Sequence, residues 1–397
     1  MSRSTGAQTG TDQRQIEIGH FFGEGDGATM LEALLDGFTS RHPNVTVTDQ
    51  SYSNTAHDLE IKCRILLENP PDVFVEWPGN NLKPYIDADV VMDISDLWEE
   101  SRLHQGFNEG ARELVSFEGR QYGIPITIHR KNNLFYNVEL AEERGIDPES
   151  ISDPTEFREV LAQAHGDGVV GMAQPMKNPW TVLQLWSQIL IGEAGADVYD
   201  DIAAGNARAH EREIRDSIQL LDDYAAFGHE NTNFQGMVGA NDAFIDGEAV
   251  FFHQGDWVAG AYAEVDGFEY QSEWDHVPFP GTEDTYVMGM DSIVAPAAAE
   301  DPETSKTFLD YVASKDALKT INGIKGSIPP RGDISLDDFP TFLQHQYRDF
   351  NRVSNHTGGQ KSMVLPDTGI EQRLAFSTFI AERDVEQTVE QLIAGYD

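Results

Sequence analysis

Cysteine and long apolar runs are scarce in this chain of 397 residues. A single cysteine, Cys63, excludes an intramolecular disulfide, and its helical context LEIKCRILLEN predicts a buried core position. No stretch approaches the ~18 uninterrupted apolar residues of a membrane-spanning helix. Residues 1–15 are polar and lack the apolar segment of a secretory signal peptide. We therefore expect neither a membrane span nor a signal peptide in this chain.

Positive charge is scarce as well. The chain has 27 Lys and Arg against 68 Asp and Glu, for a formal net charge of −41, and only nine of the cations are lysines. Such a surface repels nucleic acid, because phosphate binding needs clustered cations. The aromatic fraction of 10% and the regular apolar periodicity argue against disorder. We interpret the acid excess as adaptation to molar salt, which screens self-repulsion, and expect an extreme halophile as the source.

Motifs of catalysis and of cofactor binding are absent from the sequence. It contains no HExxH, G-x-S-x-G, CxxC or P-loop. GEGDGA at 23–28 lies between a predicted strand and a predicted helix, as a phosphate loop does, but Glu24 and Asp26 would repel a phosphate. Acidic turns at 165–168 and 197–201 do not match the calcium-loop pattern. We predict no enzyme, no cofactor and no metal; chance carboxylate pairs leave a glycan-active enzyme as an alternative.

Strand and helix patterns alternate along the chain. Residues 1–14 are rich in Ser, Thr, Gly and Gln, which predicts a mobile tether. The patterns that follow are strand 16–22, helix 29–42, strand 45–49, helix 55–68 and strand 70–77. Their short connections predict a mostly parallel, helix-covered sheet. A second set of helical and strand patterns after residue 130 predicts a second α/β lobe.

Three tryptophans occur where predicted elements begin or end. Trp77 closes the strand DVFVEW, Trp180 follows an Asn-Pro pair near a helix start, and Trp257 follows a Gly-Asp pair. A lone tryptophan is usually a core residue, and this reading stays open for each of them. Sugar sites combine flat rings, which stack on the C–H faces of a pyranose, with charged side chains that bind hydroxyls. The three tryptophans beside polar residues therefore indicate a sugar site.

Five segments in a fixed order carry a resemblance to a known family. They are YGIPITIHRKNNLFYN (122–137), GEAVFFHQGDWVAGAY (247–262), VPFPGTED (277–284), MGMDSIVAP (288–296) and NGIKGSIPPRGD (322–333). With these segments the chain, over about residues 16–395, resembles the extracellular solute-binding proteins of family 1. These are the sugar-binding subunits of ABC importers, and the similarity is greatest to the subgroup that binds glucose and related monosaccharides.

The resemblance implies a type II periplasmic-binding-protein-like fold. In that fold two α/β lobes, each a mostly parallel sheet covered by helices, are joined by hinge crossings and clamp a ligand between them. The implied division is a tether at 1–14, a first lobe of 15–128 plus about 292–330, and a second lobe of 129–291 plus about 331–397. The stretch 122–137 then becomes a hinge crossing whose apolar halves anchor in separate sheets.

The resemblance also implies the residues that bind the ligand. Matching positions are Asp26, His129, Trp257, Asp291 and Lys325. The two carboxylates can accept hydrogen bonds from vicinal hydroxyls, Lys325 and His129 can donate to sugar oxygens, and Trp257 supplies a stacking face. Bracing of the hinge by His129 and pairing of Lys325 with a carboxylate are the structural alternatives. To this set we add residues near the same loops and element ends, namely Phe22, Glu24, Glu76, Trp77 and Trp180.

Departures from the subgroup bear on the ligand. Phe21-Phe22 stands where a Trp-Trp pair is usual, and Val75-Glu76-Trp77 stands where Gln-x-His is usual. An aromatic-walled, sugar-sized cleft is preserved, while polar contacts for glucose are replaced. Within the hinge crossing we expect His129 to reach the ligand and Arg130 and Lys131 to bind acidic neighbours.

The predicted function is an extracellular substrate-binding protein of an ABC transporter. It would capture glucose or a related monosaccharide, or a small oligosaccharide, by lobe closure and deliver it to the permease subunits. Alternatives are a receptor of the same fold for a disaccharide, polyol, glycerol phosphate or peptide, although the acidic first loop disfavours anionic ligands. We expect a monomer at the cell surface, held by an N-terminal lipid anchor missing from this chain. Asn44 and Asn355 would be glycosylation acceptors there.

Overall fold

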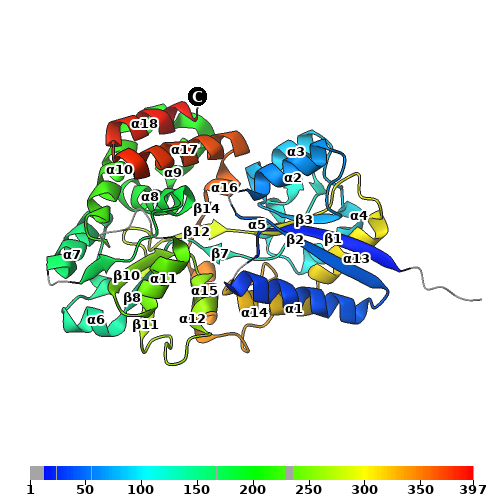
Figure 1. Ribbon diagram of the computed structural model, residues 1–397, viewed down its shortest axis with the longest axis horizontal. Helices are drawn as coiled ribbons and strands as arrows, with labels where there is room; N and C mark the ends of the chain where they lie inside the picture. The colour runs from blue at the N-terminus through cyan, green and yellow to red at the C-terminus, as the bar shows by residue number, and fades with distance from the viewer. Residues whose placement is uncertain (1–12, 24, 55, 167–168, 229–235, 397) are drawn as a thin grey trace, which may run out of the picture.

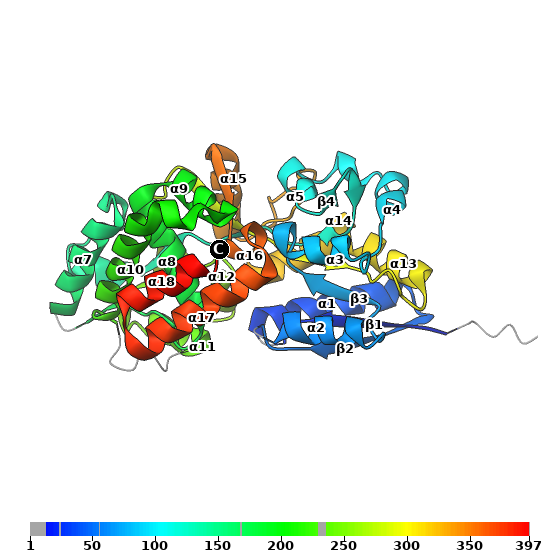
Figure 2. The same cartoon turned by 90° about the horizontal axis from the view of Figure 1, so that it is seen from above.

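The computed structural model describes residues 13–396 except 24, 55, 167–168 and 229–235. Two bodies lie side by side in Figures 1 and 2, with the short helices α15 (Thr341–Arg352) and α16 (Gln360–Met363) between them. Each body has its own sheet, and a third, smaller sheet lies between the two (Figure 1). This arrangement is the predicted two-lobe α/β fold.

The first lobe is built on a five-stranded sheet. Its strands, in spatial order, are β2 (Val45–Ser51), β1 (Arg14–His20), β3 (Val73–Glu76), β13 (Ser292–Val294) and β6 (Ile124–Pro125). Strand β1 runs parallel to β2 and β3, whereas β13 is antiparallel to both of its neighbours. Strand β1 begins at Arg14, two residues before the predicted start, because Arg14 pairs with Val45.

Helices cover both faces of this sheet because strand side chains alternate between them. Val75 packs in the core that includes Met30, Leu34 and Phe38 of α1, and Phe74 packs in the core of Ile61 on α2. The apolar positions of α1 recur at helical spacing, so its buried stripe faces the strands. The helices of this lobe are α1 (Gly25–Arg41), α2 (His57–Leu66), α3 (Lys83–Asp87), α4 (Ser95–Glu100), α5 (Glu109–Glu113), α13 (Pro302–Val312) and α14 (Lys315–Lys325), and a hairpin adds β4 (Ser116–Phe117) and β5 (Arg120–Gln121).

The second lobe is built on a four-stranded mixed sheet. Its order is β11 (Trp274–Pro278), β8 (Asn133–Asn137), β10 (Ala249–Gln254) and β9 (Val170–Met172). Strand β8 is antiparallel to β10 and β11, and only β9 is parallel to β10, so the mostly parallel sheet predicted for this lobe is wrong. Helix α8 is buried over all residues from Thr181 to Ile191, and its polar side chains Gln184, Ser187 and Gln188 are hydrogen-bonded there. The helices are α6 (Val138–Glu143), α7 (Pro154–Gly166), α8 (Pro179–Ala194), α9 (Ala196–Asp201), α10 (Glu211–Ala225), α11 (Met237–Ile245), α12 (Val258–Tyr262), α17 (Pro366–Glu382) and α18 (Val385–Ala394).

The stretch 122–137 crosses between the lobes. Strand β6 lies in the first sheet and β8 in the second, so the prediction that its two halves anchor in separate sheets is confirmed. Between them β7 (His129–Arg130) joins the three-stranded sheet with β12 (Thr285–Gly289) and β14 (Asn355–Gly358). The polar residues in the middle of the stretch therefore belong to the junction of the two lobes.

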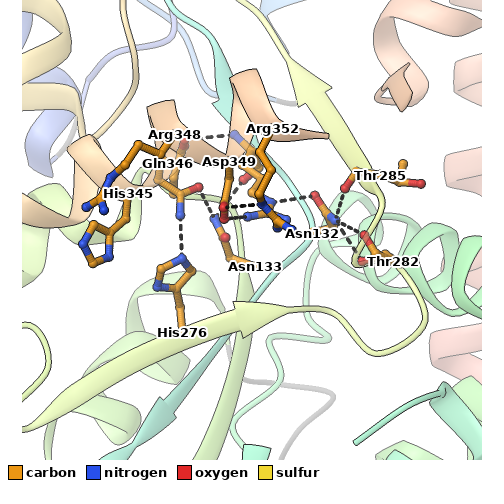
Figure 3. Close-up of polar contacts among 12 residues, drawn as sticks. Asn132, Asn133, His276, Thr282, Thr285, His345, Gln346, Arg348, Asp349 and Arg352 are labelled. Carbon is orange, nitrogen blue, oxygen red and sulfur yellow. Dashed lines mark hydrogen bonds and ion pairs between the residues drawn. The ribbon is translucent and has the colours of Figure 1, made fainter. Parts of the chain in front are cut away.

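Side chains of this crossing are held by α15 and by the loop before β12 (Figure 3). Arg130 Nη1 lies 2.7 Å from Asp349 Oδ2, so the predicted acidic partner of Arg130 is confirmed. Asn132 Nδ2 donates to Thr282 Oγ1 at 2.8 Å and to the Thr285 carbonyl at 2.9 Å. These bonds satisfy polar groups that would otherwise be buried without partners.

Two further expectations concern Cys63 and the membrane. Cys63 is exposed, so the predicted core position is wrong: α2 buries His57 and Ile61 and turns Cys63 toward solvent. Over the described part of the chain, none of the helices combines the length and the apolar character that a bilayer crossing requires. The same residues contain no group of three or more His, Cys, Asp or Glu placed to hold a metal ion.

Candidate ligand-binding site

A cavity of about 550 Å³ opens between the two lobes. Its volume is within the range of small-molecule sites. The first lobe contributes the loops after β1, β2 and β3, and the second lobe contributes α8, α11 and the start of α17. A ligand in this cavity contacts both lobes.

Eight of the ten predicted site residues line this cavity. They are Phe22, Asp26, Trp77, His129, Trp180, Trp257, Asp291 and Lys325. Glu24 lies outside the described residues. Glu76 does not line the cavity, so its predicted place in the wall is wrong.

Glu76 is enclosed behind the wall because successive strand residues point to opposite faces. Its Oε1 accepts hydrogen bonds from the Trp77 backbone N–H at 2.9 Å and from Asn81 Nδ2 at 2.6 Å. Burial raises the pKa of the Glu76 carboxyl to about 8. The residue fixes the turn that presents Trp77.

His129 lies between two carboxylates at the hinge. Its Nδ1 is 2.6 Å from Asp256 Oδ1, and its Nε2 is 3.7 Å from Asp291 Oδ2. Burial alone would lower the pKa of His129, but attraction to Asp256 outweighs it and raises the pKa. Asp291 is buried too, yet the nearby His129 lowers the pKa of the carboxyl. The three side chains thus form a charged group that orients Asp291 at the cavity.

Asp256 and Asp291 are also fixed by the backbone and by a hydroxyl. The Arg130 backbone N–H donates to Asp256 Oδ2 at 2.9 Å, and Thr127 Oγ1 donates to Asp291 Oδ2 at 3.2 Å. Rigid carboxylates bind hydroxyls at a lower entropic penalty than mobile ones.

Asp26 and Lys325 bind each other in the cavity wall. Lys325 Nζ lies 2.5 Å from Asp26 Oδ2. Lys325 is the last residue of α14, and Gly326 ends the helix with φ 73°, a conformation that favours glycine. A Cβ on Gly326 would lie 2.9 Å from the Asp256 carbonyl oxygen. Pairing with a carboxylate, the structural alternative for Lys325, is therefore present in the structure.

The indole of Trp77 is covered on both faces. Phe21 stacks on it with centroids 4.6 Å apart and planes at 12°, and Lys361 Nζ lies 2.8 Å from its ring centroid. The stacked rings of Phe21 and Trp77 leave no space between them for an ammonium group, so Lys361 lies on the opposite face of the indole. A ligand can stack on Trp77 only if Lys361 moves.

Trp180 and Trp257 form a second aromatic wall. Their rings are 6.4 Å apart at 55°, and Trp257 meets His129 edge-on at 5.3 Å and 79°. Gly255 makes room for this indole, because a Cβ there would lie 2.2 Å from Trp257 Cζ3. The loop Gly255-Asp256-Trp257 therefore combines a stacking ring with the carboxylate that holds His129.

Three cations in the cavity wall were missed by the sequence prediction. Lys131, Lys361 and Arg373 line the cavity. Lys131 was expected to bind an acidic neighbour, which is wrong: it forms no ion pair or side-chain hydrogen bond with a residue that the structure describes. Lys131 could have been predicted from its distance along the chain to His129. Residues two apart along an extended strand share a face, and His129 was already assigned to the site.

The sequence matches the family of bacterial extracellular solute-binding proteins over residues 33–342. It is 34% identical over 391 residues to a xylose/arabinose-binding protein of Haloferax volcanii, covering 96% of this chain and 84% of that protein. It is 27% identical to an uncharacterised ABC transporter extracellular-binding protein of Pyrococcus horikoshii, covering 84% and 76%.

Solved structures share the fold at low identity. A chitin oligosaccharide binding protein superposes with a TM-score of 0.86 at 15% identity, covering 97% of this chain and 98% of that one. The bacterial solute receptor AcbH, described as exclusive for β-D-galactopyranose, gives a TM-score of 0.84 at 16% identity with the same coverage. The family match spans most of the chain and agrees with the two-lobe architecture, and the chain therefore belongs to the bacterial extracellular solute-binding proteins.

Proposed function

We propose that this protein is the sugar receptor of an ABC importer, which takes a monosaccharide or small oligosaccharide into the cavity between its lobes. The observation that carries the proposal is the cavity wall itself, where two angled indoles meet a fixed carboxylate and several donors. Indole faces suit the C–H face of a sugar ring, and the charged side chains suit its hydroxyls. As a member of a family of binding proteins, the protein is not an enzyme.

The names of related proteins support a sugar but not one particular sugar. The relative from Haloferax volcanii is named for xylose and arabinose, and AcbH is described as exclusive for galactopyranose. Glucose or a related monosaccharide is therefore one candidate among several aldoses.

Capture is proposed to occur by lobe closure. The lobes would be residues 15–128 with about 292–330, and residues 129–291 with about 331–397. Trp77 and Asp26 belong to the first of these, and Trp180 and Trp257 to the second, so a ligand gains all its contacts only when the lobes meet. The closed form would then be the one that the permease subunits bind.

The place of action is proposed to be the outer cell surface. The family consists of extracellular proteins. We propose that an N-terminal lipid anchor holds the receptor near its permease. We further propose that it works as a monomer in molar salt, which screens the self-repulsion of the charge of −41 while the carboxylate-rich surface stays hydrated.

Titration with sugars tests the proposal. Monosaccharides and short oligosaccharides are added in molar NaCl, and tryptophan fluorescence and calorimetry follow the response. We expect saturable binding of at least one sugar. Trp257→Ala and Asp291→Ala should each weaken binding by about 2 kcal/mol or more, the scale of interface hot spots. Leu67→Ala, at an exposed position outside the cavity, is the control. If no sugar gives a saturable response, the proposal is wrong.

A further inference from the structure

Cations gather in the cavity of a chain that has few of them. Three of its nine lysines, Lys131, Lys325 and Lys361, line the cavity, and Arg373 joins them. They come from separate parts of the fold: Lys131 follows β7, Lys325 ends α14, Lys361 lies in α16 and Arg373 in α17. Within the described part of the chain the same wall has three carboxylates, Asp26, Asp58 and Asp291, whereas the whole chain has 68 Asp and Glu against 27 Lys and Arg.

Two of these cations make no direct ion pair with a described residue, although carboxylates lie near them: Asp291 near Lys131, and Asp58 and Glu76 near Lys361. Lys325 is paired with Asp26 at 2.5 Å, and Arg373 Nη2 lies 3.9 Å from Asp58 Oδ2. Lys131 and Lys361 form no ion pair and no side-chain hydrogen bond within the described residues. Lys361 contacts the face of Trp77, which attracts the ammonium but does not neutralise it.

The lack of a direct ion pair has an energetic consequence. Burial lowers the pKa of Lys131 to about 8 and that of Lys361 to about 7. Both ammonium groups are therefore less stable in this cavity than in water. A hydroxyl accepts a hydrogen bond from an ammonium but leaves the positive charge uncompensated. A carboxylate accepts the hydrogen bond and also neutralises the charge.

We propose that the sugar bound in this cavity carries a carboxylate, as a uronate or another sugar acid does, and that Lys131 and Lys361 bind it. The inference rests on the proposed function, since it names the chemical class of the sugar. A carboxylate that draws Lys361 off Trp77 also uncovers an indole face, on which the sugar ring can then stack.

The acidic residues of the wall do not oppose a monoanion. Asp26 is compensated by Lys325, Asp58 lies near Arg373, and Asp291 faces His129. A phosphate dianion is the competing anion: it would meet about twice the repulsion from these carboxylates and about twice the attraction to the cations, and the titration below compares the two anions directly.

The test compares matched ligands at one salt concentration and at pH 6, where both lysines are charged. Glucose and galactose are each titrated beside the corresponding uronate and uronamide, the amide being a neutral analogue of the acid. We expect the uronate of at least one pair to bind about tenfold or more tightly than its amide and its parent sugar, the scale of a hydrogen bond to a charged group.

Variants then locate the carboxylate. Lys131→Gln and Lys361→Gln should each weaken uronate binding about tenfold or more, with a smaller effect on the neutral sugars. Lys83→Gln removes a lysine on α3 that does not line the cavity and should leave every affinity unchanged. Thermal unfolding of each variant checks that the fold is intact, and the ligand comparison on the unaltered protein decides the question by itself.

Three results would overturn the inference, and they differ in whether the proposed function as a sugar receptor also fails. Neutral sugars that bind as tightly as the uronates overturn it and leave the sugar receptor intact. A hexose 6-phosphate that binds more tightly than every uronate overturns the choice of carboxylate. If neither acidic nor neutral sugars bind, the proposed function fails and the inference fails with it.

Discussion

At the scale of single residues, Glu76 is a carboxylic acid enclosed at the end of β3. Burial raises its pKa from 4.5 to about 8, so between these pH values the folded protein holds a proton that the unfolded chain releases. The stability that Glu76 contributes is therefore present in full below pH 4.5 and is lost as the pH rises to about 8.

Glu76→Gln should remove this pH dependence while keeping the oxygen that accepts from Trp77 and Asn81. Its free energy of unfolding relative to the parent should rise by up to about 1.4 kcal/mol per pH unit across that window. Urea unfolding at a series of pH values measures the difference. Glu99→Gln, at an exposed position, is the control, and parallel curves for Glu76→Gln and the parent would contradict the prediction.

Gly255 sets the position of Trp257, because a Cβ there would lie 2.2 Å from Trp257 Cζ3. Gly255→Ala should displace the indole and weaken sugar binding by about 1–2 kcal/mol, within the range of an aromatic contact. The titration described above measures the loss. Gly110→Ala, where a Cβ meets nothing within 4 Å, is the matched control. An unchanged affinity for Gly255→Ala would remove Trp257 from the binding surface.

Site residues that belong to continuous sequence motifs were predicted correctly, whereas residues whose place depends on a strand face or on distant helices were not. Trp257, Asp291 and His129 were placed by motifs that are continuous in sequence, and all three line the cavity. Strand alternation, applied strictly, would have excluded Glu76, because Val75 and Trp77 share the other face. Lys361 and Arg373 reach the cavity from α16 and α17, and no local spacing links them to the other residues.

At the scale of elements, the crossing at β7 depends on its ion pair with α15. Arg130 is fully buried, and its guanidinium contacts Asp349, Asn132 and the face of Tyr286. Asp349→Asn removes the charge partner and should lower the free energy of unfolding by about 3 kcal/mol, because it leaves a buried cation uncompensated.

The double variant Arg130→Met with Asp349→Asn should recover most of that loss, since no unpaired charge remains. Denaturant unfolding of both single variants and of the double variant gives the coupling energy. Asp87→Asn breaks an exposed pair with Lys83 and should change stability by less than about 1 kcal/mol. Strictly additive effects at Arg130 and Asp349 would show that the two charges do not depend on each other.

Long periodic elements could be predicted from the sequence, and short crossing strands could not. The order of β1, α1, β2, α2 and β3 follows from alternating hydrophobic periods. Strands β6 and β7 have two residues each, too few for any period, and their pairing depends on distant segments such as β13 and β12. Helix α2 exposes Leu59 and Leu66, and Leu67 directly after it is exposed as well, so apolar composition alone misplaced Cys63.

At the scale of the whole molecule, α12 of the second lobe touches α1 and α14 of the first at Gly260. A Cβ on Gly260 would lie 2.7 Å from the Ile324 carbonyl oxygen and 3.1 Å from Asp26 Cβ. Gly260→Ala should therefore hold the lobes apart and shift the population toward an open form.

Small-angle X-ray scattering with and without sugar measures that shift as a larger radius of gyration, together with a weaker affinity. Gly323→Ala lies in α14, where a Cβ meets nothing within 4 Å, and should behave as the parent. If Gly260→Ala scatters and binds like the parent, the contact between α12 and α14 does not limit closure.

The alternation of side chains along the crossing separates two properties of the receptor. His129 and Lys131 line the cavity, while Arg130 and Asn132 hold the junction to α15 and to the loop before β12. Substitutions at the odd positions can alter which ligand is preferred without loosening the joint, and substitutions at the even positions can do the reverse. A deletion or insertion of one residue here would exchange the two sets, so this segment can diverge by substitution but not by a change in length.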